Sequence, residues 1–236
     1  HGTCRRQRQM CIRDSFRPEK IAIKEISSGK ELSYKTLNDR SKALAGWLQK
    51  NGIEKGDRVA ILSHNCAEVF ELEFACGKIG GIELPLNWRL TKPELEYILK
   101  DSSPKVLIYS IEFEEIAEAL LKDCNIKNSL EIEENNFSSS YESAISENND
   151  FTSVECTHDD LIMLMYTSGT TGHPKGAMIT HRMQFFNIVN LASTARITDK
   201  AVQLVSLPLF HTGGMNCYAN PVLHLSLIHI SEPTRP

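Results

Sequence analysis

The sequence predicts an α/β fold with largely parallel sheets covered by helices. Short runs rich in β-branched and other apolar residues alternate along the chain with longer segments of helical period. This order is typical of βαβ units, in which a helix crosses between two parallel strands. The length of 236 residues is enough to bury a large core. The longest unbroken apolar run, 161–166, is far shorter than the roughly 18 residues that a membrane-spanning helix needs.

The expected elements follow one another in this alternating order. Strands are expected at 20–25, 58–62, 81–86, 105–110, 161–166 and 202–207, with a short one at 130–133. Helices are expected at 34–50, 67–79, 91–99, 112–122 and 181–195. Each strand is a short β-rich run, and each helix repeats apolar residues three or four apart, as Leu44 and Leu48 do. The rest of 125–160 is rich in Asn, Ser, Asp and Glu and is expected to be a solvated excursion.

Local signals set two of these boundaries. Thr91 and Glu94 have the spacing of a capping box, and Pro93 lies in the first turn of the helix that they begin. Asn51 and Gly52 are expected to end the helix at 34–50, because Gly readily takes the left-handed conformation just past a helix end.

The two ends of the sequence differ from the part between them. "RRQRQMCIRDS" at 5–15 and "LSLIHISEPTRP" at 225–236 resemble in-frame translations of the transposase adapters used in sequencing libraries. Such segments are excluded from fold reasoning. Residues 1–15 and 225–236 are therefore expected to be adapter-derived, and 16–224 to be the natural segment. A nucleic-acid-binding arm or a transit peptide is the alternative interpretation of the Arg-rich start.

The charge and the cysteines exclude several classes of protein. The net charge is −4, and because 1–15 contain four arginines and one aspartate, the rest of the chain is more acidic still. This balance argues against broad binding of nucleic acid or anionic lipid. Five cysteines lie between the two ends without any C-x-x-C pair, at positions 66, 76, 124, 156 and 217. We therefore expect reduced thiols in a cytoplasmic protein, with no disulfide framework and no metal site.

One loop carries the clearest chemical signal. "YTSGTTGHPKG" at 166–176 follows an expected strand and precedes an expected helix. Gly169 and Gly172 let the backbone approach a ligand, and the successive N–H groups of the loop are expected to form an anion-binding nest. Hydroxyls and one ammonium add further donors, from Thr167, Ser168, Thr170, Thr171 and Lys175. Charge-assisted hydrogen bonds to phosphate are worth about 1.5–3 kcal/mol each, so this set favours a polyphosphate ligand.

Two other interpretations of the loop are less favoured. The loop does not match the Walker A pattern, because Pro174 and Ala177 stand five positions after Gly169 and Gly172, where that pattern needs Gly. The sequence also contains no G-x-G-x-x-G. A kinase or P-loop ATPase is therefore not expected. A flexible Ser/Thr/Gly connector is the other interpretation, but Lys175 at a fixed offset between two ordered elements favours a binding function.

The loop resembles the signature phosphate loop of the AMP-forming adenylate-forming superfamily, which includes acyl-CoA synthetases, luciferases and the adenylation domains of peptide synthetases. Three further segments resemble family segments in family order: "LSYKTLNDRSKALAGWLQKNGIEKGDRVAIL" from Leu32, "ACGKIGGIELPLNWRLTKPELEYIL" from Ala75 and "LPLFHTGG" from Leu207. The resemblance covers 16–224. It implies a partial N-terminal large domain of the adenylate-forming fold, with the C-terminal small domain absent.

The resemblance also implies a chemistry. A carboxylate attacks the α-phosphorus of Mg-ATP, pyrophosphate leaves, and the acyl-adenylate passes its acyl group to a thiol, usually coenzyme A. The implied cofactors are ATP, Mg²⁺ and coenzyme A, and the implied partner is a small-molecule carboxylate. The residues that would hold the β- and γ-phosphates are Thr167, Ser168, Gly169, Thr170, Thr171, Gly172 and Lys175. Catalysis is then mainly positioning and charge stabilisation.

A second motif narrows the substrate. In "LPLFHTGG" the strand is expected to end at Pro208, Phe210 and His211 to face a cleft, and Gly213-Gly214 to break the chain. By resemblance, His211 lies near the adenylate and the acyl pocket. Amino-acid adenylation domains usually place Asp after that Phe, so His disfavours an amino-acid substrate. By resemblance, "PLNWRLT" and "PLFHTGG" favour a medium- or long-chain fatty acid. The other histidines between the two ends are expected on the surface or in loops, at positions 64, 158, 173, 181 and 224, and His181 is expected to help start the helix that follows.

In the family pattern, the Mg-binding acid, the ribose-binding Asp, the interdomain hinge and the C-terminal catalytic Lys all lie beyond the position of His224. The 236-residue chain is therefore expected to be an inactive fragment of an acyl-CoA synthetase. An adenylation unit of a peptide synthetase and a non-catalytic nucleotide-binding module remain as alternatives, and a homodimer stays open. No nucleic-acid partner and no integral membrane segment are expected.

Overall fold

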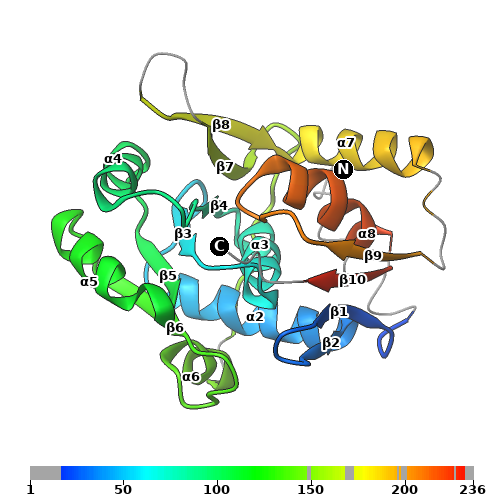
Figure 1. Ribbon diagram of the computed structural model, residues 1–236, viewed down its shortest axis with the longest axis horizontal. Coiled ribbons are helices and arrows are strands. Elements are labelled where there is room, and N and C mark those ends of the chain that lie inside the picture. The colour runs from blue at the N-terminus through cyan, green and yellow to red at the C-terminus, as the bar shows by residue number, and fades with distance from the viewer. Residues whose placement is uncertain are drawn as a thin grey trace.

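The computed structural model describes residues 17–147, 150–167, 173–195, 197, 201–225 and 227–231. Within these residues one sheet has four strands, in the order β2 (Glu31–Ser33), β1 (Ile21–Glu25), β10 (Ile228–Ser231) and β9 (Val202–Val205). The second has six, in the order β6 (Asn128–Ile132), β5 (Val106–Ser110), β3 (Arg58–Leu62), β4 (Ile82–Pro85), β7 (Leu161–Thr167) and β8 (Lys175–Thr180) (Figure 1). Neighbouring strands are parallel except in the pairs β1–β2 and β7–β8, which confirms the predicted class.

Helices connect and cover these strands. They are α2 (Tyr34–Lys50), α3 (Ala67–Ile79), α4 (Lys92–Ser102), α5 (Glu114–Asp123), α6 (Ser140–Ser146), α7 (His181–Thr194) and α8 (Asn220–His224), with a 3-10 turn η1 (Ile111–Phe113) and a π-helix η2 (Gly213–Ala219). The capping box of Thr91 and Glu94 begins α4, and α2 ends as predicted at Asn51, with Gly52 at φ +81°. Among the described helices, none is long and apolar enough to cross a bilayer.

The structure also contains elements that the sequence pattern misses: β2, α6, β8, η2, α8 and β10. The stretch 125–160, expected to be a solvated excursion with one short strand, holds both β6 and α6. Helix α6 has only seven residues and buries only Tyr141 and Ala144, so its pattern is too short to detect. Strand β8 is defined by its antiparallel pairing with β7. Short elements of this kind owe their stability to the neighbours on which they pack.

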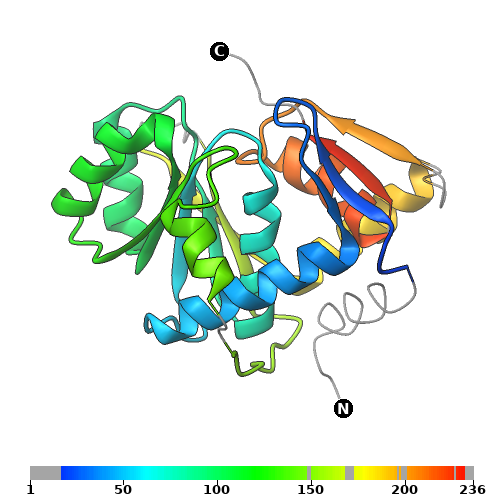
Figure 2. The same ribbon diagram turned by 90° about the horizontal axis from the view of Figure 1, so that it is seen from below.

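Both faces of the six-stranded sheet are covered by helices. Alternate residues of β5 enter two cores: Val106 and Ile108 lie in the core that includes α2 and α3, while Leu107 and Tyr109 lie in the core of α4 and α5. In a parallel sheet that is buried on both faces, the strands are nearly continuous apolar runs in the sequence. Strands β3 and β5 of this sheet follow that pattern. Figure 2 shows α3 between the two sheets, and its side chains are buried on nearly every side.

Helix α3 buries four charged side chains, and each has a partner on another element. The pairs are Glu68 with Lys30, Glu71 with Arg40, Glu73 with Gln184, and Lys78 with Asn38. Burial by itself would raise the pKa of Glu68, but the Lys30 ammonium, a backbone hydrogen bond and the Arg40 guanidinium together outweigh burial and lower it. A charge in the interior is tolerated only when it is paired and hydrogen-bonded. The four pairs therefore fix α3 against the β1–β2 hairpin, α2 and α7.

Arg40 and Glu71 form the centre of a network between α2, α3 and α6. Arg40 Nε donates to Glu71 Oε1 at 2.6 Å. The terminal nitrogens of Arg40 donate to both carboxylate oxygens of Glu142, at 2.8 and 2.6 Å. Tyr141 donates its hydroxyl proton to Glu71 Oε2 at 2.7 Å. Because the Glu71 side chain has no solvent exposure, its carboxylate depends on these two donors.

Replacing Arg40 with Met should destabilise the chain by about 3–5 kcal/mol, because the buried carboxylate of Glu71 would lose its charged partner. The measurement is urea denaturation. Lys35→Met on the same helix is the control, since Lys35 pairs with Asp39 in solvent, and it should change stability little. Equal losses for the two variants would show that the Arg40 network does not stabilise the fold.

Strand β10 lies within 225–236, the stretch whose adapter origin remains a prediction. It pairs in parallel with β1 on one side and with β9 on the other. His229 on this strand is fully buried, and its ring meets that of Phe70 edge-on, with 4.8 Å between centroids. Within the described residues neither ring nitrogen has a hydrogen-bond partner. Burial lowers the pKa of His229 to about 3, so the imidazole is neutral in the folded chain.

His229 makes the stability of the fold depend on pH. The unfolded chain takes up a proton at this residue near pH 6.5, whereas the folded chain does so only near pH 3. Stability is therefore lost as the pH falls through this window. Against His229→Leu, the unmodified chain should lose about 2–3 kcal/mol more between pH 6.5 and pH 4.5 in denaturation experiments. Parallel pH profiles of the two proteins would mean that His229 is not buried between β1 and β9.

Candidate functional site

The antiparallel hairpin of β7 and β8 carries both ends of the predicted phosphate loop. Thr167, the last residue of β7, lies opposite Lys175, the first residue of β8. Both side chains are exposed, so the hydroxyl and the ammonium are presented together at the tip of the paired region. The other predicted loop residues lie outside the described part of the chain: Ser168, Gly169, Thr170, Thr171 and Gly172.

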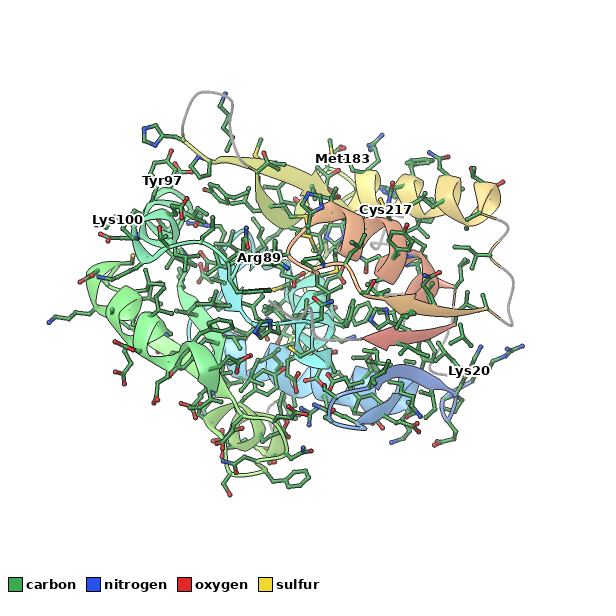
Figure 3. All side chains as sticks on the ribbon, in the orientation of Figure 1. Lys20, Arg89, Tyr97, Lys100, Met183 and Cys217 are labelled. Atoms are coloured by element: carbon green, nitrogen blue, oxygen red, sulfur yellow. The ribbon has the colours of Figure 1, made fainter. Side chains whose placement is uncertain are left out.

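Side chains of α4 support this hairpin. Tyr166 donates its hydroxyl proton to the carboxylate of Asp101 on α4. Burial and this hydrogen bond together raise the pKa of Tyr166. The ring of His173 stacks on that of Tyr97, also on α4, at 5.1 Å between centroids (Figure 3). A Cβ on Gly176 would lie 2.9 Å from the Leu164 side chain and 3.2 Å from the Tyr166 ring, so a larger residue at the start of β8 would require the Leu164 side chain to move.

The side chain of Asn65 holds the turn before His211. Strand β9 ends at Val205, three residues earlier than predicted, and the chain then turns. Asn65, which follows β3, donates from Nδ2 to the Leu207 carbonyl at 2.9 Å and accepts from the Leu209 N–H at 2.9 Å. The turn ends β9 because its backbone groups pair with this amide. Asn65 thereby joins the end of β3 to the end of β9.

His211 is exposed at the end of this turn. Its Nδ1 accepts the backbone N–H of Gly213 at 3.1 Å. This hydrogen bond assigns the tautomer: in the neutral ring the proton resides on Nε2. His211 can therefore offer an N–H donor to a ligand while its ring is held by its own backbone.

The two glycines after His211 do not break the chain, contrary to the prediction. They begin the π-helix η2. A Cβ on Gly214 would lie 2.2 Å from the Pro208 carbonyl oxygen, whereas one on Gly213 would find its nearest neighbour, His211 Nδ1, at 3.4 Å. Gly214 is thus required where the helix packs on the turn, and that packing allows the helix to continue.

Aromatic rings connect the His211 turn to the loop after β4. Trp88 lies edge-on to Phe210 with 6.5 Å between centroids, and its other neighbour is His64 at 4.3 Å. The guanidinium of Arg89, labelled in Figure 3, lies 4.2 Å from the Trp88 ring centroid. Trp88 therefore packs against the His211 turn. His181 corrects another expectation, because it is buried at the start of α7 and does not lie on the surface.

A cavity of about 570 Å³ lies between the β1–β2 hairpin, α2, the start of α3 and the segments that follow β3, β5 and β6, and Asn65 is among its lining residues. Its lining includes the pairs Lys30–Glu68 and Arg40–Glu142. These charges satisfy one another, and none of the predicted site residues that the structure describes contributes to the lining. We therefore place the candidate site at the β7–β8 hairpin and the His211 turn. In the described part of the chain, no cluster of His, Cys, Asp and Glu could hold a metal ion.

Comparison with known proteins identifies the family. Residues 13–236 match the family model described as AMP-binding enzyme. The chain belongs to this family. Feruloyl-CoA synthase of Amycolatopsis sp. is 35% identical over 206 residues, which make up 87% of this chain and 39% of that protein. A long-chain-fatty-acid–CoA ligase of Mycobacterium tuberculosis is 34% identical over 205 residues, 86% of this chain and 40% of that protein.

The structural comparison agrees. The crystal structure of ATP-bound MatB from Rhodopseudomonas palustris superposes with a TM-score of 0.83 at 29% identity, over 94% of this chain and 44% of that one. The chain spans about two fifths of the length of the curated relatives that it matches. The expectation of a partial N-terminal domain of the AMP-binding fold is thereby confirmed.

Two buried polar residues of this AMP-binding domain were not among those predicted from the sequence. Asn65 and Asn216 are both buried, and both hold the segment around His211. The backbone partners of Asn65, at Leu207 and Leu209, lie more than 140 positions further along the chain, so its role becomes visible only in the fold. Asn216 has two partners at a spacing of four residues, Thr212 and Asn220, and that helical spacing is the signal that could have indicated it.

Gly214→Ala should destabilise the chain by about 2–3 kcal/mol, because the new methyl group would overlap the Pro208 carbonyl. Gly213→Ala is the matched control, since a Cβ there makes only ordinary contacts, and its effect should stay below about 0.5 kcal/mol. Urea denaturation of the two variants measures the difference. If both are equally stable, the contact of η2 with the turn is looser than described.

Proposed function

We propose that the protein to which this chain belongs activates a carboxylic acid with ATP and transfers the acyl group to coenzyme A. The observation that carries the proposal is the pairing of Thr167 with Lys175 at the base of the phosphate-loop motif, in a chain of the AMP-binding family. Relatives that are acid–CoA ligases support the same reaction.

The proposed roles follow from the chemistry of each group. Lys175 and the loop hydroxyls hold the β- and γ-phosphates, which leave as pyrophosphate when a carboxylate oxygen bonds the α-phosphorus. The Lys175 ammonium neutralises charge on this leaving group, and Mg²⁺ would arrive with the nucleotide. His211 lies beside the adenylate and the acyl group, where its Nε2–H is free of the Gly213 contact. The acyl carbon then bonds the coenzyme A sulfur, and AMP leaves.

For the acid we propose a medium- or long-chain fatty acid. The residue after Phe210 is His211, not the Asp that would pair with a substrate ammonium, and this favours an acid without an amino group. A long-chain-fatty-acid–CoA ligase is among the relatives. Feruloyl-CoA synthase is similar to the same degree, so an aromatic acid is the second candidate. An amino-acid adenylation unit and a non-catalytic nucleotide-binding module are the remaining alternatives.

We also propose that 1–15 and 225–236 are adapter-derived and that 16–224 belong to a longer cytoplasmic enzyme. His229 supports this, because a buried imidazole without hydrogen-bond partners in the described chain is poorly suited to an inner strand. Without the family's downstream acidic residues and lysine, the 236-residue chain should not release pyrophosphate. The genomic reading frame past His224 tests the origin of the tail: a natural frame that continues with 225–236 would refute it.

Lys175→Met in the complete protein should raise the KM for ATP about ten- to a hundredfold, the equivalent of one lost charge-assisted bond to phosphate. The assay is pyrophosphate release with ATP, coenzyme A and a panel of fatty, aromatic and amino acids. Lys100→Met is the control, because Lys100 is also exposed but pairs with Glu96 on α4. Equal KM values for the two variants would show that Lys175 does not contribute to nucleotide binding. Fastest turnover of an amino acid would overturn the substrate class.

A further inference from the structure

A buried amide touches both segments of the candidate site. Asn216 lies in the middle of η2 with 6% of its surface exposed. Its Nδ2 donates to the Thr212 hydroxyl at 3.1 Å and lies 3.8 Å from Met165 Sδ. Thr212 directly follows His211, and Met165 lies on β7 two residues before Thr167. The same NH₂ group thus contacts the His211 turn and the strand that leads into the phosphate loop.

Donors on the opposite side fix the orientation of this amide. Asn216 Oδ1 accepts from Asn220 Nδ2 at 3.3 Å and from Gln184 Nε2 at 3.5 Å. The Asn216 carbonyl accepts from Asn187 Nδ2 at 2.7 Å. Since donors surround Oδ1, Nδ2 must face Thr212 and β7. The amide is therefore held in one orientation by α7 and α8; Figure 3 marks α7 by Met183 and η2 by Cys217.

The support for Asn216 extends to the core. Gln184 Nε2 also donates to Glu73 Oε1 on α3 at 2.7 Å. Both Gln184 and Glu73 are buried, so this hydrogen bond cannot be exchanged for one to water without opening the interior. A chain of polar groups consequently runs from α3 between the sheets, through α7, to the turn at His211. Short π-helical segments such as η2 are often found at functional sites.

We propose that Asn216 is a positioning residue for acyl activation. It sets the His211 turn relative to the end of β7, and therefore relative to the phosphates that the loop would hold. The inference rests on the proposed function, and Asn216 acts through Thr212 and Met165 without touching the substrate. A shift of about 1 Å in a catalytic site can lower the rate about a hundredfold, so one hydrogen bond that fixes a turn is enough to matter.

Asn216→Asp and Thr212→Val test the proposal in the complete protein. The first replaces the Nδ2 donor with an oxygen and keeps the shape; the second removes the acceptor and leaves Asn216 intact. Asn220→Ala is the matched control, because it removes a hydrogen bond from the far side of the same amide. Two quantities are measured: the kcat and KM of acyl-adenylate formation, and hydrogen exchange of the Gly213 amide, which bonds His211 Nδ1.

Asn216→Asp and Thr212→Val should each lower kcat about tenfold or more, with the KM for ATP within about twofold, and should speed Gly213 exchange. The double variant should lose no more than the worse single one, because both changes break the same contact. Asn220→Ala should lose stability but keep kcat and Gly213 exchange. Loss of kcat by all three in proportion to stability, or independent effects in the double variant, would overturn the proposal.

The exchange measurement separates this inference from the proposed function. If the complete protein activates no acid, the rate of Gly213 exchange still reports whether Asn216 holds the His211 turn. Unchanged exchange in Asn216→Asp would overturn the positioning role whatever the reaction is. If Gly213 exchange is faster in Asn216→Asp but the complete protein has no ligase activity, Asn216 still positions the His211 turn. Only the proposed reaction would then be wrong.

Discussion

The charged side chains of α3 impose the constraint on which the rest of the structure depends. A helix placed between two sheets has no face left for water, so each of its ionised groups needs a partner from a neighbouring element. Those partners come from the β1–β2 hairpin, α2 and α7. Removing one partner would leave a buried charge, and this is why the elements can adopt only one arrangement around α3.

This arrangement of elements around α3 also positions the candidate site. Glu73 of α3 accepts from Gln184 of α7, and Gln184 in turn donates to Asn216 beside the His211 turn. From the other side, the Asn65 side chain, which follows β3, holds the same turn through hydrogen bonds to two backbone groups. The β7–β8 hairpin is fixed separately, through Tyr166 and α4. The exposed groups that we propose bind a ligand are thus positioned by buried groups.

The residues that we propose for this site could be chosen from the sequence, because they lie close together in the chain. The hydroxyls, glycines and Lys175 of the phosphate loop form one run, and His211 lies within a short motif. What could not be predicted were the contacts between distant segments. Asn65 and Leu207 are 142 positions apart, and Gly214 is needed only because its backbone packs on Pro208. Such contacts produce no local pattern in the sequence.

By itself, the sequence determined the alternation of strands and helices, the bounds of α2 and α3, the parallel class and the membership of a nucleotide-binding family. These follow from periodicity, capping residues and short motifs, which act within a few residues. Tertiary structure alone decided which polar residues are interior, that Gly213 and Gly214 begin a helix, and that β10 lies between β1 and β9. The physical reason is that burial and hydrogen-bond partnership are properties of the surroundings, which exist only after distant segments have packed together.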